Sequence, residues 1–261
     1  MSEPVLLEER RGAVVCITLN RPRQLNALNT ELREALSAFW RRFRDDASLA
    51  VAIVTGAGDR AFSTGRDLKE TAAADAAGGR VSYEDTGEYG YPARVQIGKP
   101  VIAAVHGHCL AAGLMLVTGC DIRICSEGAS FGNPQAKRGR GTRTPYELAR
   151  IGVPLAVVMD MAMTGEPIDA QTALRCGLVS RVVPQAQLLP TAWAMGERIA
   201  ANSPVVVGGL KRASEVGLFE LPANEALKLW EPVTRMMGNT ADAVEGARSF
   251  AEKRQAQYVT S

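Results

Sequence analysis

Short runs of apolar residues, each about as long as a buried strand, recur through the first half of the chain. They are rich in β-branched residues and bounded by turn-forming residues, which favours strands over helices. The predicted strands are residues 4–9, 13–19, 51–55, 101–106 and 121–126. Helical or irregular crossovers separate the last three, and strands joined by helical returns predict a stacked α/β spiral in place of one flat sheet.

Helical spacing of apolar residues marks one segment near the start and most of the last third of the chain. Residues 31–43 predict an amphipathic helix capped by Asn29 or Thr30. From residue 185 onward the predicted helices are residues 188–201, 205–216, 223–237 and 241–258. No linker rich in Pro, Gly or Ser separates this part, so we expect it to pack on the core or on a neighbouring subunit.

Composition and charge narrow the class of protein. The 261 residues are 46% hydrophobic and 22% charged with a net charge of +2, which predicts a soluble globular protein and gives no reason to expect nucleic acid or a membrane as a partner. The five cysteines form no C-x-x-C pair, so we interpret them as reduced core thiols. The acidic start has no export signal, and together these features predict a cytoplasmic protein.

Two small-residue turns carry the chemistry. The first is Phe62-x-x-Gly65-x-Asp67-Leu68, and the second runs from Gly107 to Gly113. Each follows an apolar run and opens a helix, where backbone N–H groups have no intrahelical acceptor. Two such turns can aim N–H groups at one oxygen atom, which is what polarising a thioester carbonyl requires. The alternative is that the small residues only allow close helix packing.

These turns, in their order and spacing with other motifs, resemble the crotonase (enoyl-CoA hydratase/isomerase) superfamily over nearly the whole chain. The other motifs are Asn20-Arg21-Pro22, Leu25-Asn26-Ala27-Leu28-Asn29, Thr164-Gly165-Glu166-Pro167-Ile168, Gly177-Leu178-Val179 and Phe250-Ala251-Glu252-Lys253-Arg254. The resemblance implies an α/β crotonase-like ββα spiral at residues 1–200 that binds acyl-CoA, and a helical trimerisation region at residues 201–261. It also implies a homotrimer or hexamer.

The resemblance assigns roles to single residues. The oxyanion-hole N–H groups would be those of Arg66 and Ala112. Arg23 and Lys253 would contact CoA phosphates, and Phe250 would flank the adenine of a neighbouring subunit's ligand. The expected substrate-binding residues are Arg23, Leu25, Ala27, Ser63, Gly65, Asp67, Leu68, Lys69, Phe250 and Lys253.

The chain departs from the family at the two catalytic acids. Where the family's hydratases have glutamates, this sequence has Met115 and Gln135. Neither side chain transfers a proton near neutral pH. Adding water across a C=C bond needs a base and an acid, so we expect standard hydratase activity to be weak.

His108 is another acid/base candidate, whereas His106 ends an apolar strand and is interpreted as a core residue. With two histidines in the chain, we expect no multi-histidine metal site and no cofactor beyond CoA.

Two segments leave alternatives open. Residues 71–96 form either a mobile flank of the active site, with Glu84, Asp85, Glu88 and Tyr89 as candidates to reach it, or a surface insertion. The basic loop Lys137 to Arg143 holds four cations in seven residues. Three interpretations of this loop stay open: it binds an acyl group that carries its own carboxylate, it binds CoA phosphate, or it is a solvated face.

The function of the whole chain also has two interpretations. It is either an enzyme with a non-standard acid/base set or a non-catalytic acyl-CoA binding protein.

Overall fold

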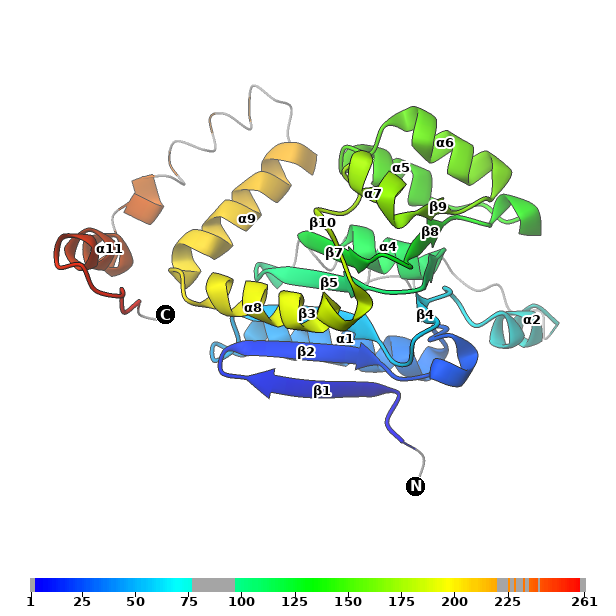
Figure 1. Cartoon of the computed structure of the whole chain (residues 1–261), viewed down its shortest axis with the longest axis horizontal. Coiled ribbons are helices and arrows are strands. Elements are labelled where there is room, and N and C mark those ends of the chain that lie inside the picture. Colours follow the sequence, from blue (N-terminus) through cyan, green and yellow to red (C-terminus); the bar gives the residue numbers. More distant parts are fainter. Residues whose placement is uncertain are drawn as a thin grey trace.

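Six strands form the main sheet of the computed structural model (Figure 1), which describes residues 3–76, 97–219, 225, 228, 232, 235–238 and 240–258. Its strand order is β1-β2-β3-β5-β7-β10. The strands are β1 (Leu6–Arg11), β2 (Val14–Leu19), β3 (Val51–Gly56), β5 (Val101–Val105), β7 (Ile122–Ser126) and β10 (Arg181–Val183). β1 runs antiparallel to β2, and the remaining neighbours are parallel.

A second, smaller sheet turns the chain into a spiral. Its order is β4-β6-β8-β9, formed by β4 (Ala61–Ser63), β6 (His108–Leu110), β8 (Ser130–Gly132) and β9 (Ile168–Asp169). β4, β6 and β8 each follow a strand of the main sheet and precede a helix: α2 (Leu68–Ala76), α4 (Ala112–Thr118) or the short 3₁₀ helix η3 (Ala136–Arg138). The repeated strand–strand–helix unit confirms the predicted α/β spiral.

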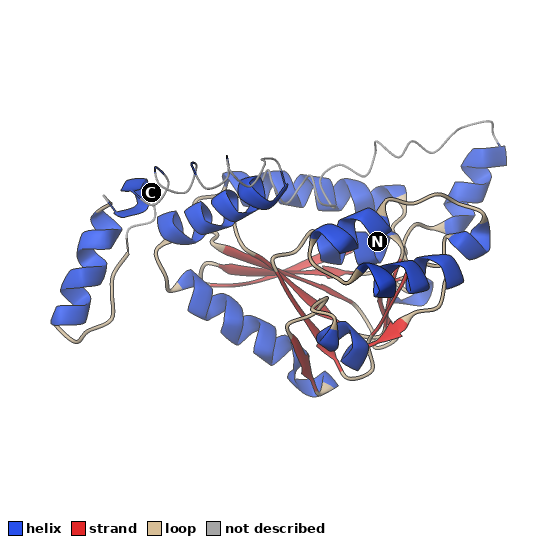
Figure 2. Ribbon diagram, turned by 90° about the horizontal axis from the view of Figure 1, so that it is seen from above, coloured by secondary structure: helices blue, strands red, loops and turns tan. Residues whose placement is uncertain are grey.

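Residues alternate between the two faces of the main sheet, and each face has its own helix. Val15 and Val54 belong to the core cluster that α1 (Thr30–Asp45) completes. Val14 and Ile53 face the cluster that includes α8 (Leu188–Ala200). This follows from the period of two along a strand. Figure 2 shows helices on both sides of the strands.

The remaining helices complete the body and the C-terminal region. They are η1 (Pro22–Gln24), α5 (Thr144–Arg150), α6 (Leu155–Thr164), α7 (Ala170–Arg175), η4 (Gln185–Gln187), α9 (Pro204–Phe219) and α11 (Ala241–Ala251). The sequence pattern did not predict α5, α6 or α7. The predicted helix over residues 241–258 was too long, because the backbone leaves the helix after Ala251 and Lys253 has φ 53°. Most of the predicted helix over residues 223–237 lies outside the described residues.

The described part of the chain shows neither a helix long and apolar enough to cross a membrane nor a group of three or more His, Cys, Asp or Glu side chains placed to hold a metal ion.

Candidate functional site

The two predicted turns are in direct contact. A Cβ atom placed on Gly65 would lie 3.1 Å from the backbone nitrogen of Ala112 and 2.8 Å from the Cβ of Ala111. Gly65 itself has φ 92°, a conformation that favours glycine. The first turn is tied to the preceding loop because Leu28 N donates to Gly65 O at 2.8 Å and Asp67 N donates to Leu28 O at 3.3 Å. The backbone of Arg66 therefore lies beside the start of α4.

Ala111 gives the second turn its direction. It has φ 54° and ψ −119°, which is strained for a residue with a Cβ. Its N–H donates to Gly132 O at 2.9 Å, which fixes the strained residue to β8. Ala112 is then the first residue of α4, and its N–H has no acceptor within the described part of the chain. Strain at this position is typical of backbone shaped for a function.

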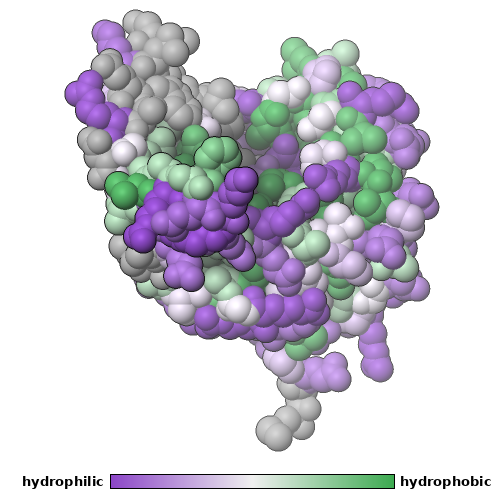
Figure 3. All heavy atoms as spheres, turned by 60° about the vertical axis from the view of Figure 1, so that its left-hand side comes forward, coloured by the Kyte–Doolittle hydropathy of each residue, from purple (hydrophilic) through white to green (hydrophobic). Residues whose placement is uncertain are grey.

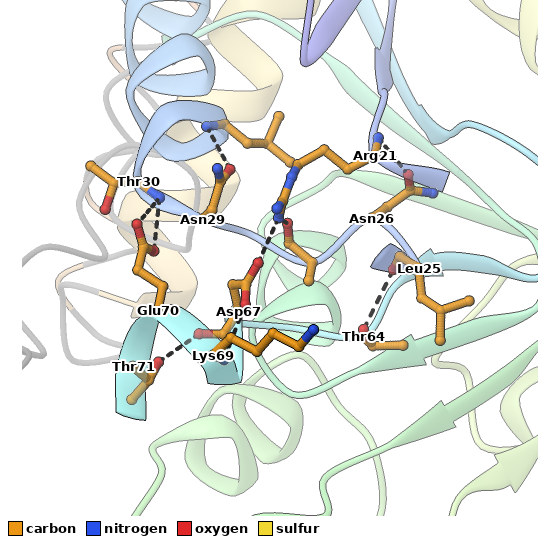
Figure 4. A network of polar contacts seen from close by, with 12 residues as sticks. Arg21, Leu25, Asn26, Asn29, Thr30, Thr64, Asp67, Lys69, Glu70 and Thr71 are labelled. Carbon is orange, nitrogen blue, oxygen red and sulfur yellow. Dashed lines mark hydrogen bonds and ion pairs between the residues drawn. The ribbon is translucent and has the colours of Figure 1, made fainter. Parts of the chain in front are cut away.

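Asn26 holds the loop before α1 against the first turn. Its side chain is fully buried and accepts from Arg21 N at 3.0 Å, while its Nδ2 donates to Ala61 O at 2.7 Å and to Ala57 O at 2.9 Å. Leu25 and Asn26 both have φ 53°, and Leu25 O accepts from Thr64 N at 3.1 Å. Figure 4 shows Arg21, Asn26 and Thr64 around the loop that precedes α1.

Asp67 has a structural contact that the sequence did not indicate. Its Oδ2 lies 3.0 Å from Nη1 of Arg21, and its Oδ1 accepts from Lys69 N at 3.1 Å (Figure 4). Burial works to raise the pKa of Asp67, but the hydrogen bonds from Arg21 and from the Glu70 and Lys69 backbone outweigh it, and the pKa is lowered. The carboxylate thus stays charged and positions the turn.

One cavity collects the residues singled out for the chemistry. It has a volume of 580 Å³, and Arg66, Ala112, Met115 and Gln135 all line it. The other lining residues are Thr64, Leu68, Thr71, Ala111, Arg138, Arg140, Gly141, Thr142 and Arg143. The turns and the basic loop, far apart in sequence, therefore surround one space.

In the part of the chain that the structure describes, the cavity wall contains no proton-transfer group of the usual kind. Among the described residues, no Asp, Glu, His, Cys, Lys or Tyr lines it. Met115 is 9% exposed, and Oε1 of Gln135 is buried without a hydrogen-bond partner in the described part of the protein. Behind the wall, Glu147 of α5 is buried and its Oε1 lies 3.5 Å from Nε of Arg143. The sequence analysis did not single out Glu147, although it lies four residues after Arg143, at the spacing of an i,i+4 helical pair.

Neither histidine lines the cavity. His108 is exposed on β6, and its Nδ1 lies 2.9 Å from Oγ of Ser130. His106 is buried, its Nε2 has no partner among the described residues, and burial lowers its pKa. Glu84, Asp85, Glu88 and Tyr89 lie outside the described residues.

The expected CoA-binding residues fall into three groups. Leu68 lines the cavity. Ser63 is buried in the turn before it, and the Ser63 Oγ donates a hydrogen bond to Asn26 O at 2.8 Å. Arg23, Leu25, Ala27 and Lys69 lie on the loop and helix beside the cavity without lining it. Phe250 belongs to α11 and Lys253 follows it by two residues. α11 lies at the opposite end of the molecule from α2 (Figure 1).

Comparisons with known proteins agree with this architecture. A family model described as enoyl-CoA hydratase/isomerase matches residues 9–261. Carnitinyl-CoA dehydratase of Escherichia coli (strain K12) is 37% identical over 267 residues, covering 97% of each chain. (E)-benzylidenesuccinyl-CoA hydratase of Thauera aromatica is 35% identical, covering 96% of this chain and 97% of that protein. The crystal structure of an enoyl-CoA hydratase/isomerase from Mycobacterium paratuberculosis has a TM-score of 0.88 and 33% identity, with all of both chains covered.

Proposed function

Because this chain belongs to the enoyl-CoA hydratase/isomerase family of the crotonase superfamily, we propose that it binds acyl-CoA thioesters with the carbonyl oxygen between the backbone N–H groups of Arg66 and Ala112. The observation that carries the proposal is the shared cavity, in which both turns meet and which Met115 and Gln135 also line. Each oxyanion-hole donor typically contributes about 3 kcal/mol to stabilising an enolate in a site closed to water.

The reaction depends on which groups move protons. The family members named above add water to an acyl-CoA or remove it, so we propose a lyase-type reaction on a thioester enolate for this chain. Met115 and Gln135 stand where the acids are expected, and neither exchanges a proton near neutral pH. The proposal therefore includes a non-standard acid/base set and weak standard hydratase activity.

A second candidate function is non-catalytic binding of acyl-CoA. It is favoured by the composition of the cavity wall, which in the described part of the protein has no carboxylate, histidine, cysteine or lysine. An intact oxyanion hole would then select thioesters without turning them over. The two candidates share the binding site and differ in turnover.

We also propose a homotrimer or a dimer of trimers, with residues 1–200 as the acyl-CoA-binding core and residues 201–261 as the assembly region. The exposed apolar side chains of α11, Val244 at 69% and Phe250 at 87%, support this proposal because they are left without cover in a single chain.

We propose no cofactor beyond CoA. The five cysteines form no disulfide, which supports a reducing, cytoplasmic location.

Calorimetric titration tests the binding function. We expect butanoyl-CoA to bind, and to bind more tightly than the matching 3′-dephospho-CoA thioester, because Arg23 and Lys253 are proposed to contact phosphate oxygens. The difference should shrink at high salt, since exposed charges are screened. Equal affinity for the two would remove the phosphate contacts. Absence of binding to any CoA thioester would overturn the proposed function.

A further inference from the structure

The basic loop forms one wall of the cavity. Arg138, Arg140 and Arg143 all line it, with Gly141 and Thr142 between them. The remaining lining includes apolar residues such as Leu68, Ala112 and Met115, and Arg66 adds a fourth cation. No acidic side chain in the described part of the protein lines the cavity. The space beside the two turns is therefore electropositive, and its apolar lining strengthens that field.

Backbone hydrogen bonds fix this loop to the position of the missing acid. Both Arg138 N and Arg140 N donate to Gln135 O, at 2.9 Å and 3.1 Å. Gly139 closes the turn in the left-handed conformation with φ 62°. The backbone that carries Arg138 and Arg140 is thus fixed to Gln135, the position at which the family's hydratases are expected to have an acid. We therefore expect a ligand group bound by this loop to be part of the acyl chain.

The cations of the loop differ in what they contact. Lys137 forms an ion pair with Glu166 and does not line the cavity. Arg143 has Glu147 at 3.5 Å. The Arg138 side chain, by contrast, has neither a hydrogen bond nor an ion pair with any described residue. A guanidinium in a cavity with no internal carboxylate is suited to an anion from the ligand.

We infer that the acyl group of the substrate carries its own carboxylate, held by Arg138 with Arg140 and Arg143. The inference rests on the proposed acyl-CoA binding and names the substrate class. The replacement of the two acids agrees with it: Met115 and Gln135 place no negative charge where a second carboxylate would be repelled. The same guanidinium groups could instead meet CoA phosphates, which is the other source of an anion.

Two CoA thioesters of equal chain length separate these sources. Glutaryl-CoA ends in a carboxylate and pentanoyl-CoA in a methyl group, and both carry the same phosphates. Calorimetry on the wild-type chain should give glutaryl-CoA the higher affinity, by roughly tenfold or more, as hydrogen bonds to a charged group allow. Arg138→Gln should lower that ratio by roughly fivefold or more, although Arg140 and Arg143 remain, and leave the affinity for pentanoyl-CoA within about twofold.

Lys137→Gln is the matched control, because it removes one cation from the same loop without touching the cavity wall. It should leave the affinity ratio unchanged. Equal affinities of the wild-type chain for the two thioesters would overturn the inference and leave the proposed function standing. Equal weakening of both by Arg138→Gln would assign the arginine to phosphate and also overturn it. Binding of neither thioester would overturn the proposed function itself.

Discussion

Single residues decide how the two turns meet. Ala111 holds a backbone conformation that disfavours any side chain, and Gly65 packs against it with φ 92°. Side-chain atoms of Ala111 leave no room for a Cβ at position 65. Because the Ala112 N–H follows directly, a small shift at Gly65 would move the donor that the thioester oxygen is proposed to meet.

Gly65→Ala tests this arrangement. The new Cβ would lie 2.8 Å from Ala111 Cβ and 3.1 Å from Ala112 N, and the left-handed backbone adds strain, so we expect unfolding free energy to fall by about 1–3 kcal/mol. Butanoyl-CoA affinity should fall as well, as measured by denaturant unfolding and calorimetry. Gly128→Ala is the control, since nothing lies within 4 Å of its Cβ. If both variants behave like wild type, the turns do not depend on this contact.

At this scale, the sequence motifs grouped positions that the fold does bring together, but they did not indicate the side-chain contacts. Arg66, Ala112, Met115 and Gln135 were grouped from motifs, and they do line one cavity. The ion pair between Arg21 and Asp67 was not predicted, because the two residues are 46 positions apart and only the folded loop joins them. The backbone strain at Ala111 was not predicted either, because an alanine in a sequence does not indicate whether its backbone is strained.

The strands of the main sheet before β10 and the first helix were predicted best, whereas α5, α6 and α7 were not predicted. The five predicted strands and the first helix exist with ends shifted by one or two residues. β1 was placed two residues too early, because it is exposed along most of its length and has no clear alternation. The strands of the small sheet contain two or three residues, which is too short for periodicity to show.

The C-terminal helices carry the assembly proposal. α11 exposes Val244 and Phe250, and Met236 before it is 59% exposed. Figure 3 brings forward the left-hand side of Figure 1, where α11 lies. Apolar and strongly hydrophilic side chains lie next to one another on this side of the molecule. The buried hydrogen bond from Ser203, the residue before α9, to Asp242 fixes the start of α11 to its own chain. The exposed apolar side chains of α11 take no part in this contact, so they are available for the proposed interface between copies of the chain.

Light scattering of the full chain should give three or six times the 27.9 kDa chain mass, because the exposed apolar residues of α11 need cover. Truncation after residue 240 should yield a smaller assembly and weaker binding of butanoyl-CoA, since it removes both Phe250 and Lys253. The intact chain serves as the control in both measurements. A monomer of 27.9 kDa at micromolar concentration would contradict the assembly proposal.

The whole molecule has the fold of its family, and we propose that it differs from the family's hydratases in the side chains at the two acid positions. The spiral brings three successive strand–strand–helix units together so that the turns before α2 and α4 and the loop after β8 enclose one cavity. We propose that this geometry polarises a thioester carbonyl, whereas no Asp, Glu or His among the described residues lines the cavity to serve as the acid or the base of a standard hydratase. The central proposal is therefore a site that binds the thioester but has weak standard hydratase activity.

The rate of crotonyl-CoA hydration in wild type, Met115→Glu, Gln135→Glu and the double variant tests that claim most directly. We predict a wild-type rate near the detection limit, slight activity in each single variant, and a rate in the double variant above the sum of the singles. The reason is that the two carboxylates act as a unit on one water and one α-carbon. Efficient hydration by the wild-type chain would contradict the account and assign proton transfer to another residue, with His108 and Glu88 the first to replace.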